Sequence, residues 1–171
     1  MSLYRGCSLM LNGFDVPNMV NYSPPEIATD TRWFKAGAMD APVPVDCGTK
    51  AMTATYKCIG MDYGSILLFG AIPGIRARLS VRRAYRGALS ASGVTYLDEE
   101  VEGMITSVKA DDQGNDNKAE VGQLIAVSAS YYKISTNLGV PLLEISPSHG
   151  LRKILGINVL GIPNNILNLI L

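Results

Sequence analysis

The sequence predicts a mainly β protein, an antiparallel β-sandwich or barrel with one short flanking α-helix and a long extended hairpin arm. Three observations lead to this fold class. Runs that alternate apolar and polar residues recur along the chain, and turn dipeptides separate them. One helix-start signal stands among these runs. A proline-rich segment, Ala36–Gly48, lies between two runs and is too long for a tight hairpin turn.

Length and composition limit the possible functions. A chain of 171 residues is the size of one domain, so we expect a single domain over residues 1–171. Its 15 basic and 15 acidic residues cancel, so no global field attracts nucleic acid or a membrane. Cys7, Cys47 and Cys58 have the spacing of neither a disulfide framework nor a zinc site, and we expect free, buried thiols. The first residues lack the pattern of a signal peptide, so we expect folding inside a cell.

The first strands are predicted from turn chemistry. Residues 8–20 predict a short hairpin, because Asn12-Gly13 is a strong two-residue turn between extended runs. Residues 21–25, with the sequence NYSPP, predict an irregular connection. Further along, Asp62 can cap a short helix over residues 63–69, which we expect to pack against a sheet.

The long hairpin arm is predicted between the second and third runs. Residues 26–35 and 50–59 both alternate, and we expect them to pair as the two legs of one long hairpin. Between them lies Ala36–Gly48, the arm segment. Pro42 and Pro44 fix the backbone and remove two donors, so we expect an extended loop that lies outside any sheet and projects from the body.

Two neighbouring strands are predicted to carry opposite charges. Residues 75–86 and 94–109 both alternate, with apolar residues on one face and charges on the other. The arginine row is Arg76, Arg78, Arg82 and Arg86, and the acidic row is Asp98, Glu100 and Glu102. Opposite charges on paired strands stabilise an antiparallel pair, but the same rows could match a neighbouring subunit. Arg83 falls outside the alternation, and the basic row lacks the interleaved aromatics of a nucleic-acid site.

The second half of the chain continues as strands. Residues 110–119 predict a polar loop, residues 120–136 a long strand, and residues 140–145 a closing strand after an Asn-Leu-Gly turn. The apolar C-terminal arm, residues 149–171, differs. Residues 151–155 fit a helical stripe, but glycines, asparagines and a proline argue against a membrane-spanning helix, so we expect this arm to dock on the protein or on a neighbour.

No catalytic, cofactor or metal site is predicted. His149 is the one histidine, and the chain has neither a CxxC pair nor a nucleotide-binding glycine motif. Glu99 and its acidic neighbours could form an acid–base pair, but acidic strand faces are more often solvated or salt-bridged. Asp111, Asp112 and Asp116 lack the spacing and closing glutamate of a calcium loop. We therefore expect a protein that is not an enzyme.

Five stretches resemble the major tail tube protein of contractile-tailed bacteriophages and of the related R-type bacteriocins. They are AGAMDAPVPVD (36–46), RRAYRGAL (82–89), EGMITSVKADD (102–112), AVSASYYKI (126–134) and PLLEISP (141–147). The resemblance spans almost the whole chain. It implies a fold that is similar to that of the type VI secretion tube protein. Ala38 stands where the family pattern leads us to expect glycine, and the C-terminal end is more apolar than expected.

The resemblance implies a structural function. It implies six-fold rings that stack into a hollow tube inside a sheath, with baseplate and tail terminator proteins as further partners and DNA passing transiently through the lumen. It also implies a place in the virion tail, after synthesis and assembly in the host cytoplasm, without membrane insertion. The inter-ring arm would include Ala36, Gly37, Met39, Asp40, Pro42, Pro44 and Asp46, and candidate lumen residues are Glu26, Asp30, Arg32, Thr53, Thr55 and Lys57. The alternative is a monomeric β-sandwich binding module that uses the arm segment as its ligand loop.

Overall fold

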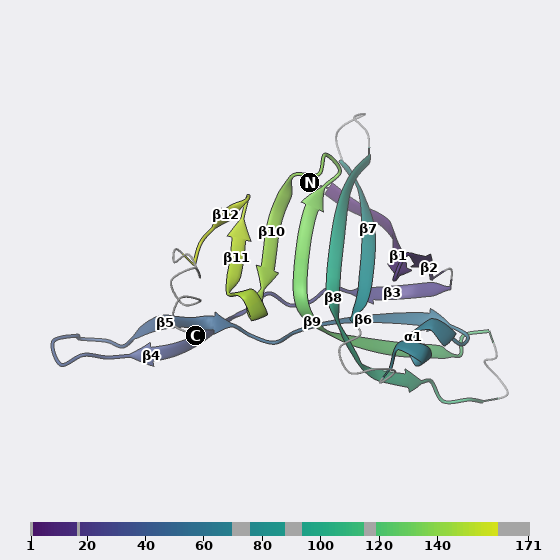
Figure 1. Cartoon of the computed structure of the whole chain (residues 1–171), viewed down its shortest axis with the longest axis horizontal. Coiled ribbons are helices and arrows are strands. Elements are labelled where there is room, and N and C mark those ends of the chain that lie inside the picture. The colour runs from purple at the N-terminus through teal and green to yellow at the C-terminus, as the bar shows by residue number, and fades with distance from the viewer. Residues whose placement is uncertain (1, 17, 70–75, 88–93, 115–118, 161–171) are drawn as a thin grey trace.

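The computed structural model describes residues 2–16, 18–69, 76–87, 94–114 and 119–160, whose strands form two packed layers and a projecting hairpin (Figure 1). The first layer contains β12 (Ile157–Asn158), β11 (Leu151–Ile154), β10 (Pro141–Ser146), β9 (Gly122–Thr136), β8 (Val94–Ala110), β7 (Ala77–Gly87), β1 (Ser2–Leu11) and β2 (Phe14–Asp15), in that order. The second layer contains β3 (Met19–Ser23), β6 (Met52–Ile59) and the other halves of β9 and β8. β4 (Thr29–Phe34) and β5 (Val43–Thr49) form a separate two-stranded sheet. All pairs of described strands are antiparallel and close no barrel, which confirms the predicted fold class as a sandwich.

The long strands β8 and β9 belong to both layers. Residues 122–129 of β9 pair with β6, whereas residues 132–135 pair with β10. Between these halves the β8–β9 register shifts at Glu102/Gly103, which places a bulge where both strands turn from one layer into the other. The backbones approach so closely there that a Cβ on Gly103 would lie 2.0 Å from the carbonyl oxygen of Ser128. The corner between the layers therefore requires glycine.

The hydrophobic core lies between the two layers. The buried apolar side chains of the first layer come from β1, β7, β8, β9 and β10, and those of the second layer come mainly from β6 and the first half of β9; they include Leu9, Leu79, Val81, Val101, Tyr132, Ile145, Met52, Ala54, Tyr56, Ile125 and Val127. Both β6 and β7 alternate buried with more exposed residues along most of their length. Burial of one face of each strand is thus what the period-two pattern predicted.

The helix α1 (Tyr63–Leu68) covers one end of the sandwich, beside the β1–β2 hairpin (Figure 1). Asp62 caps it as predicted, because its carboxylate accepts a hydrogen bond from the backbone N–H of Gly64 at 3.0 Å. The hydroxyl of the buried Tyr56 donates to the same carboxylate at 3.1 Å. A six-residue helix is too short to be stable alone, so these contacts and packing hold it.

The pairing within the long hairpin differs from the prediction. β6 pairs with β3 and β9 and not with residues 26–35, although the Lys50 N–H just before β6 donates to the carbonyl oxygen of Ala28 at 2.9 Å. The predicted irregular stretch 21–25 contains most of β3. β4 pairs instead with β5 inside the arm segment, where Pro44 stands opposite Trp33. A two-stranded sheet has two open edges, so a strand can carry proline with its missing donor turned outward. The observed hairpin is therefore shorter than predicted, but its ladder extends into the arm segment, and the loop at its tip is shorter than the predicted one.

The C-terminal arm begins as strands and not as the predicted helical stripe. After a 3₁₀ turn, η1 (Pro147–His149), the chain forms β11 and β12 along the edge of the first layer. Gly150 and Gly156 adopt positive φ, at 55° and 82°, and allow the turns before and after β11. The docking of residues 161–171 lies outside the described part of the chain. Among the described residues, no helix is long and apolar enough to cross a membrane.

The three cysteines are free, but they are not equally buried. Cys58 is buried in the core and Cys7 is half-buried. Cys47 is exposed on β5, so the prediction of burial is wrong for this residue. Its strand belongs to a hairpin that packs against no second layer, and so alternation cannot bury either of its faces.

Candidate assembly site

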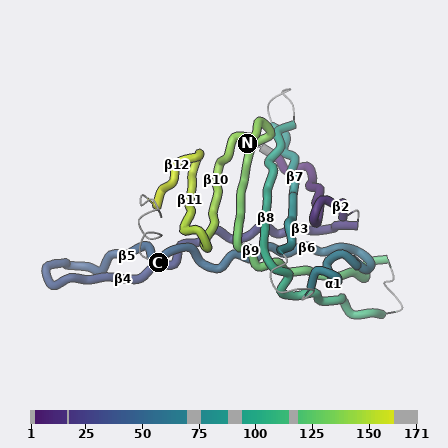
Figure 2. Tube along the Cα trace, viewed as in Figure 1, coloured from purple at the N-terminus to yellow at the C-terminus, as the bar shows by residue number. Residues whose placement is uncertain are grey.

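The β4–β5 hairpin projects from the sandwich as a thin two-stranded ribbon (Figure 2). Every residue of β4 is exposed, and large apolar side chains face solvent: Trp33 is 70% exposed and Phe34 is 56% exposed. Val43 and Val45 are exposed on the opposite strand. An isolated two-stranded ribbon is marginally stable in water, and contiguous exposed apolar residues mark interaction surfaces. The geometry of this hairpin suits contact with another molecule.

The predicted arm residues divide between the hairpin tip and β5. Ala36, Gly37, Met39, Asp40 and Pro42 lie in the tip, where Met39 is the one half-buried residue among them and its N–H donates to the carbonyl oxygen of Ala36 at 3.0 Å. Pro44 and Asp46 lie in β5 and are exposed. The structure therefore places all seven on the projecting hairpin.

The base of the hairpin is tied to the C-terminal strand β11. Arg152 donates to the Asp46 carboxylate at 2.6 Å and to the Thr49 hydroxyl at 3.0 Å, although it lies about a hundred residues further along the chain. The Arg152 guanidinium, with the N–H of Gly48, holds the pKa of Asp46 below its usual range. A helix over residues 151–155 would not predict this contact. Only the strand assignment places Arg152 beside β5.

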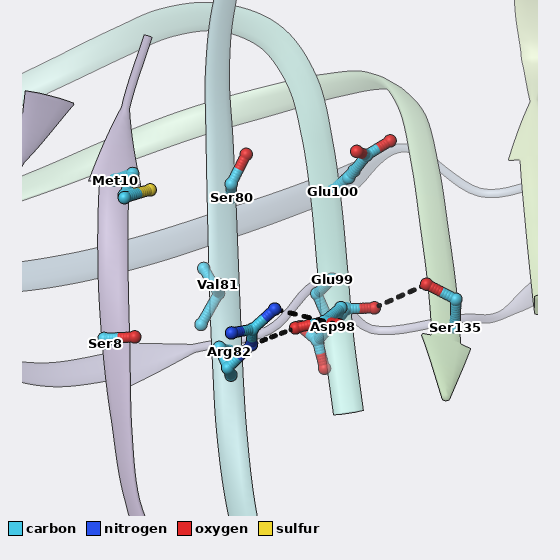
Figure 3. Close-up of a pocket in the computed structure, with 9 residues that line it drawn as sticks. All are labelled: Ser8, Met10, Ser80, Val81, Arg82, Asp98, Glu99, Glu100 and Ser135. Carbon is cyan, nitrogen blue, oxygen red and sulfur yellow. Dashed lines mark hydrogen bonds and ion pairs between the residues drawn. The ribbon is translucent and has the colours of Figure 1, made fainter. Parts of the chain in front are cut away.

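The arginine and acidic rows pair with each other inside one chain. Arg82 lies opposite Asp98 with 2.6 Å between Nε and Oδ1, and Figure 3 shows this pair on the outer face of the sheet. Arg78 contacts Glu100 at 2.9 Å and Glu102 at 3.6 Å. For these residues the structure supports the cross-strand interpretation. Exposed ion pairs of this kind contribute little stability.

Two arginines of that row remain without such a partner. Arg76 and Arg86 are both exposed, and no ion pair joins either one to another residue of the described ranges. A shallow depression of about 410 Å³ lies beside Arg82 and Asp98, lined by Ser8, Met10, Ser80 and Ser135 among others (Figure 3). In the described part of the chain, Arg78 and Arg82 thus have acidic partners, whereas Arg76 and Arg86 have none.

A buried polar cluster was missed by the sequence reasoning. The carboxylate of Glu99 is completely buried, forms an ion pair with Arg83, and accepts a hydrogen bond from the Tyr22 hydroxyl at 3.0 Å. Burial is the largest cause that raises the pKa of Tyr22 above its usual value. The signal was available, because Arg83 breaks the alternation of β7. The cluster connects β7 and β8 to β3, which leads into the projecting hairpin.

The candidate lumen residues lie in two separate groups. Thr53, Thr55 and Lys57 share the outer face of β6, and Lys57 pairs with Asp111 at 2.7 Å. Glu26, Asp30 and Arg32 are exposed, on or beside β4 in the other sheet. The structure brings each group together but does not join the two into one face.

His149 and Asp111, which the sequence analysis considered as catalytic or metal-binding residues, contact neighbouring side chains in the structure. The His149 ring nitrogen Nδ1 lies 2.9 Å from the Ser146 hydroxyl, within the η1 turn. Asp111 pairs with Lys57 and accepts from the N–H of Gly122, and both contacts lower its pKa, the lysine more strongly. Within the described ranges, no group of three or more His, Cys, Asp or Glu side chains is arranged to hold a metal ion.

Comparisons with known proteins agree with this geometry. The model of the phage tail tube protein FII family matches residues 4–161. A chain in the cryo-EM structure of the anti-feeding prophage baseplate, 6-fold symmetrised, has a similar fold: the TM-score is 0.51 at 8% identity, over 75% of this chain and 90% of that chain. Nothing among the curated proteins matches. The family match covers the projecting hairpin and the strands of the sandwich, apart from the first two residues of β1, and this chain therefore belongs to the phage tail tube protein FII family, a family of structural tail proteins.

Proposed function

We propose that copies of this chain form rings that stack into the hollow inner tube of a contractile phage tail, a conduit for genome delivery through the host envelope. The observation that carries this proposal is the β4–β5 hairpin, which exposes Trp33 and Phe34 on a ribbon with no second layer. Such a ribbon gains stability when another copy covers it. The arm segment, Ala36–Gly48, then connects one ring to the next.

Six copies per ring is the number we propose, because the baseplate with a similar fold is described as 6-fold symmetrised. The tail sheath, baseplate and tail terminator proteins are the proposed partners, and DNA passes transiently through the lumen. The tube belongs to the virion tail and is assembled in the host cytoplasm without membrane insertion. We assign it no catalytic activity and no cofactor.

Charge supports the lumen assignment. The equal numbers of acidic and basic residues let rings stack without strong repulsion. The outer face of β6 offers the hydroxyls of Thr53 and Thr55 beside Lys57, whose charge Asp111 offsets. A wall of this kind is polar without being strongly basic, so DNA would pass without adhering. Arg76 and Arg86 are left to contact neighbouring subunits within the ring.

Negative-stain electron microscopy of the purified protein tests the proposal. We expect rings and tubes, and analytical ultracentrifugation should show large species whose proportion rises with concentration. A monodisperse monomer at all concentrations would contradict the proposal and favour a binding module that uses the arm segment as its ligand loop. Removing the tip residues 37–41 should leave folded protein that forms rings without long tubes, whereas the single change Leu138→Ser, in an exposed turn away from the hairpin, serves as a control.

A further inference from the structure

An apolar groove lies at the end of the sandwich far from the projecting hairpin (Figure 1). It has a volume of about 380 Å³ and lies between the β1–β2 hairpin and α1; we call it the α1 groove. Phe14, on β2, and Leu67, on α1, line it and are 79% and 73% exposed. Exposed apolar residues gathered around a hollow mark a docking surface. The size falls in the range of pockets that hold compact, mostly apolar ligands.

Two carboxylates, Asp15 and Asp62, complete the lining of the α1 groove. Asp62 accepts hydrogen bonds from the α1 backbone and from neighbouring hydroxyls, but no cation among the described residues pairs with it. Asp15 likewise has no ion-pair partner within the described ranges. The groove therefore combines an apolar floor with net negative charge, so it fits a segment that carries aromatic rings flanked by cations.

The chain itself contains such a segment. Residues 32–35 read Arg-Trp-Phe-Lys on the projecting hairpin, where Trp33 and Phe34 are largely exposed. Arg32 and Lys35 are also exposed and form no ion pair with the described residues. Because consecutive residues of a strand point to opposite faces, Trp33 supplies the apolar contact, and the cations before and after the aromatic pair match the carboxylates of the groove. Figure 1 shows that this segment and the groove lie at opposite ends of the molecule, so the occupant must come from a second copy.

We propose that the α1 groove binds residues 32–35 of the projecting hairpin of a second copy of this chain. This rests on the proposed function and deepens it, because it names the surface that receives the hairpin. A contact between one end of a molecule and the opposite end of the next is heterologous, and such contacts propagate into rings or filaments. Trp33 is the anchor of the contact, and Arg32 and Lys35 set its register against Asp15 and Asp62.

Trp33 is the one tryptophan in the chain, so its fluorescence reports the contact directly. In dilute monomer its emission should be that of an exposed indole. As concentration rises and the protein associates, the emission should shift to the blue, and acrylamide quenching should fall. The change Leu67→Glu places a charge on an exposed helix position inside the groove, and it should weaken association about 30-fold or more. The matched control Leu138→Glu, at an exposed position outside the groove, should behave as the unmodified protein.

Charge reversal adds a second readout. Asp15→Lys alone should weaken association, with a loss that added salt reduces, and so should the paired changes Arg32→Glu and Lys35→Glu. Combining Asp15→Lys with the single change Lys35→Glu should recover part of the lost blue shift, since Asp62 keeps its charge and its match to Arg32. Circular dichroism spectra and monomer melting temperatures checked on each variant ensure that only folded proteins are compared.

The outcomes separate this inference from the proposed function. Tubes in which Trp33 stays open to acrylamide would overturn the groove contact and leave the tube function intact. A blue shift that survives Leu67→Glu would also overturn it, since another surface would then receive the hairpin. Unmodified protein that stays monomeric, with no rings under the microscope and an exposed Trp33 throughout, would overturn both.

Discussion

Replacing Arg83 by methionine should lower the free energy of unfolding strongly, so that the protein unfolds at lower temperature and lower urea concentration. Methionine keeps a long apolar side chain but removes the cation that pairs with the fully buried Glu99 carboxylate. Breaking a buried pair by removing one partner costs about 3–5 kcal/mol, because a charge stays buried without compensation. In a domain of this size we expect the melting temperature to fall by about 6–20 °C. A loss of this size is a large fraction of the 5–15 kcal/mol that typically stabilises a folded domain.

The companion variants show which physical effect operates. Tyr22→Phe removes one hydrogen bond to a charged group and should cost about 1.5–3 kcal/mol. The double change Arg83→Met with Glu99→Leu removes both charges and should recover most of the stability lost by Arg83→Met alone. Urea unfolding of the monomer measures all three variants under one set of conditions. If Arg83→Met costs under about 1 kcal/mol, or if the double variant is no more stable than the single one, the buried-charge reasoning is wrong.

The other predictions concern the corner, the hairpin base and the charged face. Gly103→Ala should destabilise severely in thermal melts, because its Cβ would overlap backbone, whereas Gly37→Ala, with open space around it, should be nearly neutral. Arg152 depresses the pKa of Asp46, so their contact is intact above the ordinary aspartate pKa and is lost as pH falls through the depressed value. Protection of residues 29–49 against hydrogen exchange, taken relative to the intrinsic exchange rate at each pH, should therefore be lower there than at neutral pH. Arg82→Glu should change unfolding free energy by at most about 1 kcal/mol, since its ion pair is exposed; a larger loss in urea titrations would contradict that.

Turn dipeptides, helix caps and alternation in the sequence predicted the elements that depend on short-range interactions. Asn12-Gly13 forms the expected turn, Asp62 caps the expected helix, and β7 buries the face that its alternation indicates. The opposed rows of arginine and acid indicated an antiparallel pair or a subunit contact, and in the structure β7 pairs with β8 so that Arg82 faces Asp98. These features depend on nearest neighbours in the chain or across one ladder, and for that reason residue type and spacing are sufficient.

The pairing of the long hairpin could not be predicted in this way. Residues 26–35 and 50–59 both alternate, but alternation does not say which strand is the partner of which. Pro44 argues against the interior of a sheet, but an open-edged two-stranded ribbon tolerates it. In the same way, residues 151–155 fit a helical spacing over too few positions to decide between helix and strand. These residues form the strand β11 because the open edge of β10 supplies backbone hydrogen-bond partners for another strand.

Residue types and their spacing are enough to predict the mainly β class, the balanced charge, the helix after Asp62 and the family resemblance. They do not predict that β8 and β9 turn through Gly103 into two layers, that Glu99 and Arg83 meet Tyr22 in the interior, or that Arg152 holds the base of the projecting hairpin. The cause is the distance along the chain between the partners. The side-chain contacts join residues that are between 16 and 106 positions apart, and the corner depends on two strands together. The local sequence around one partner therefore does not predict the other.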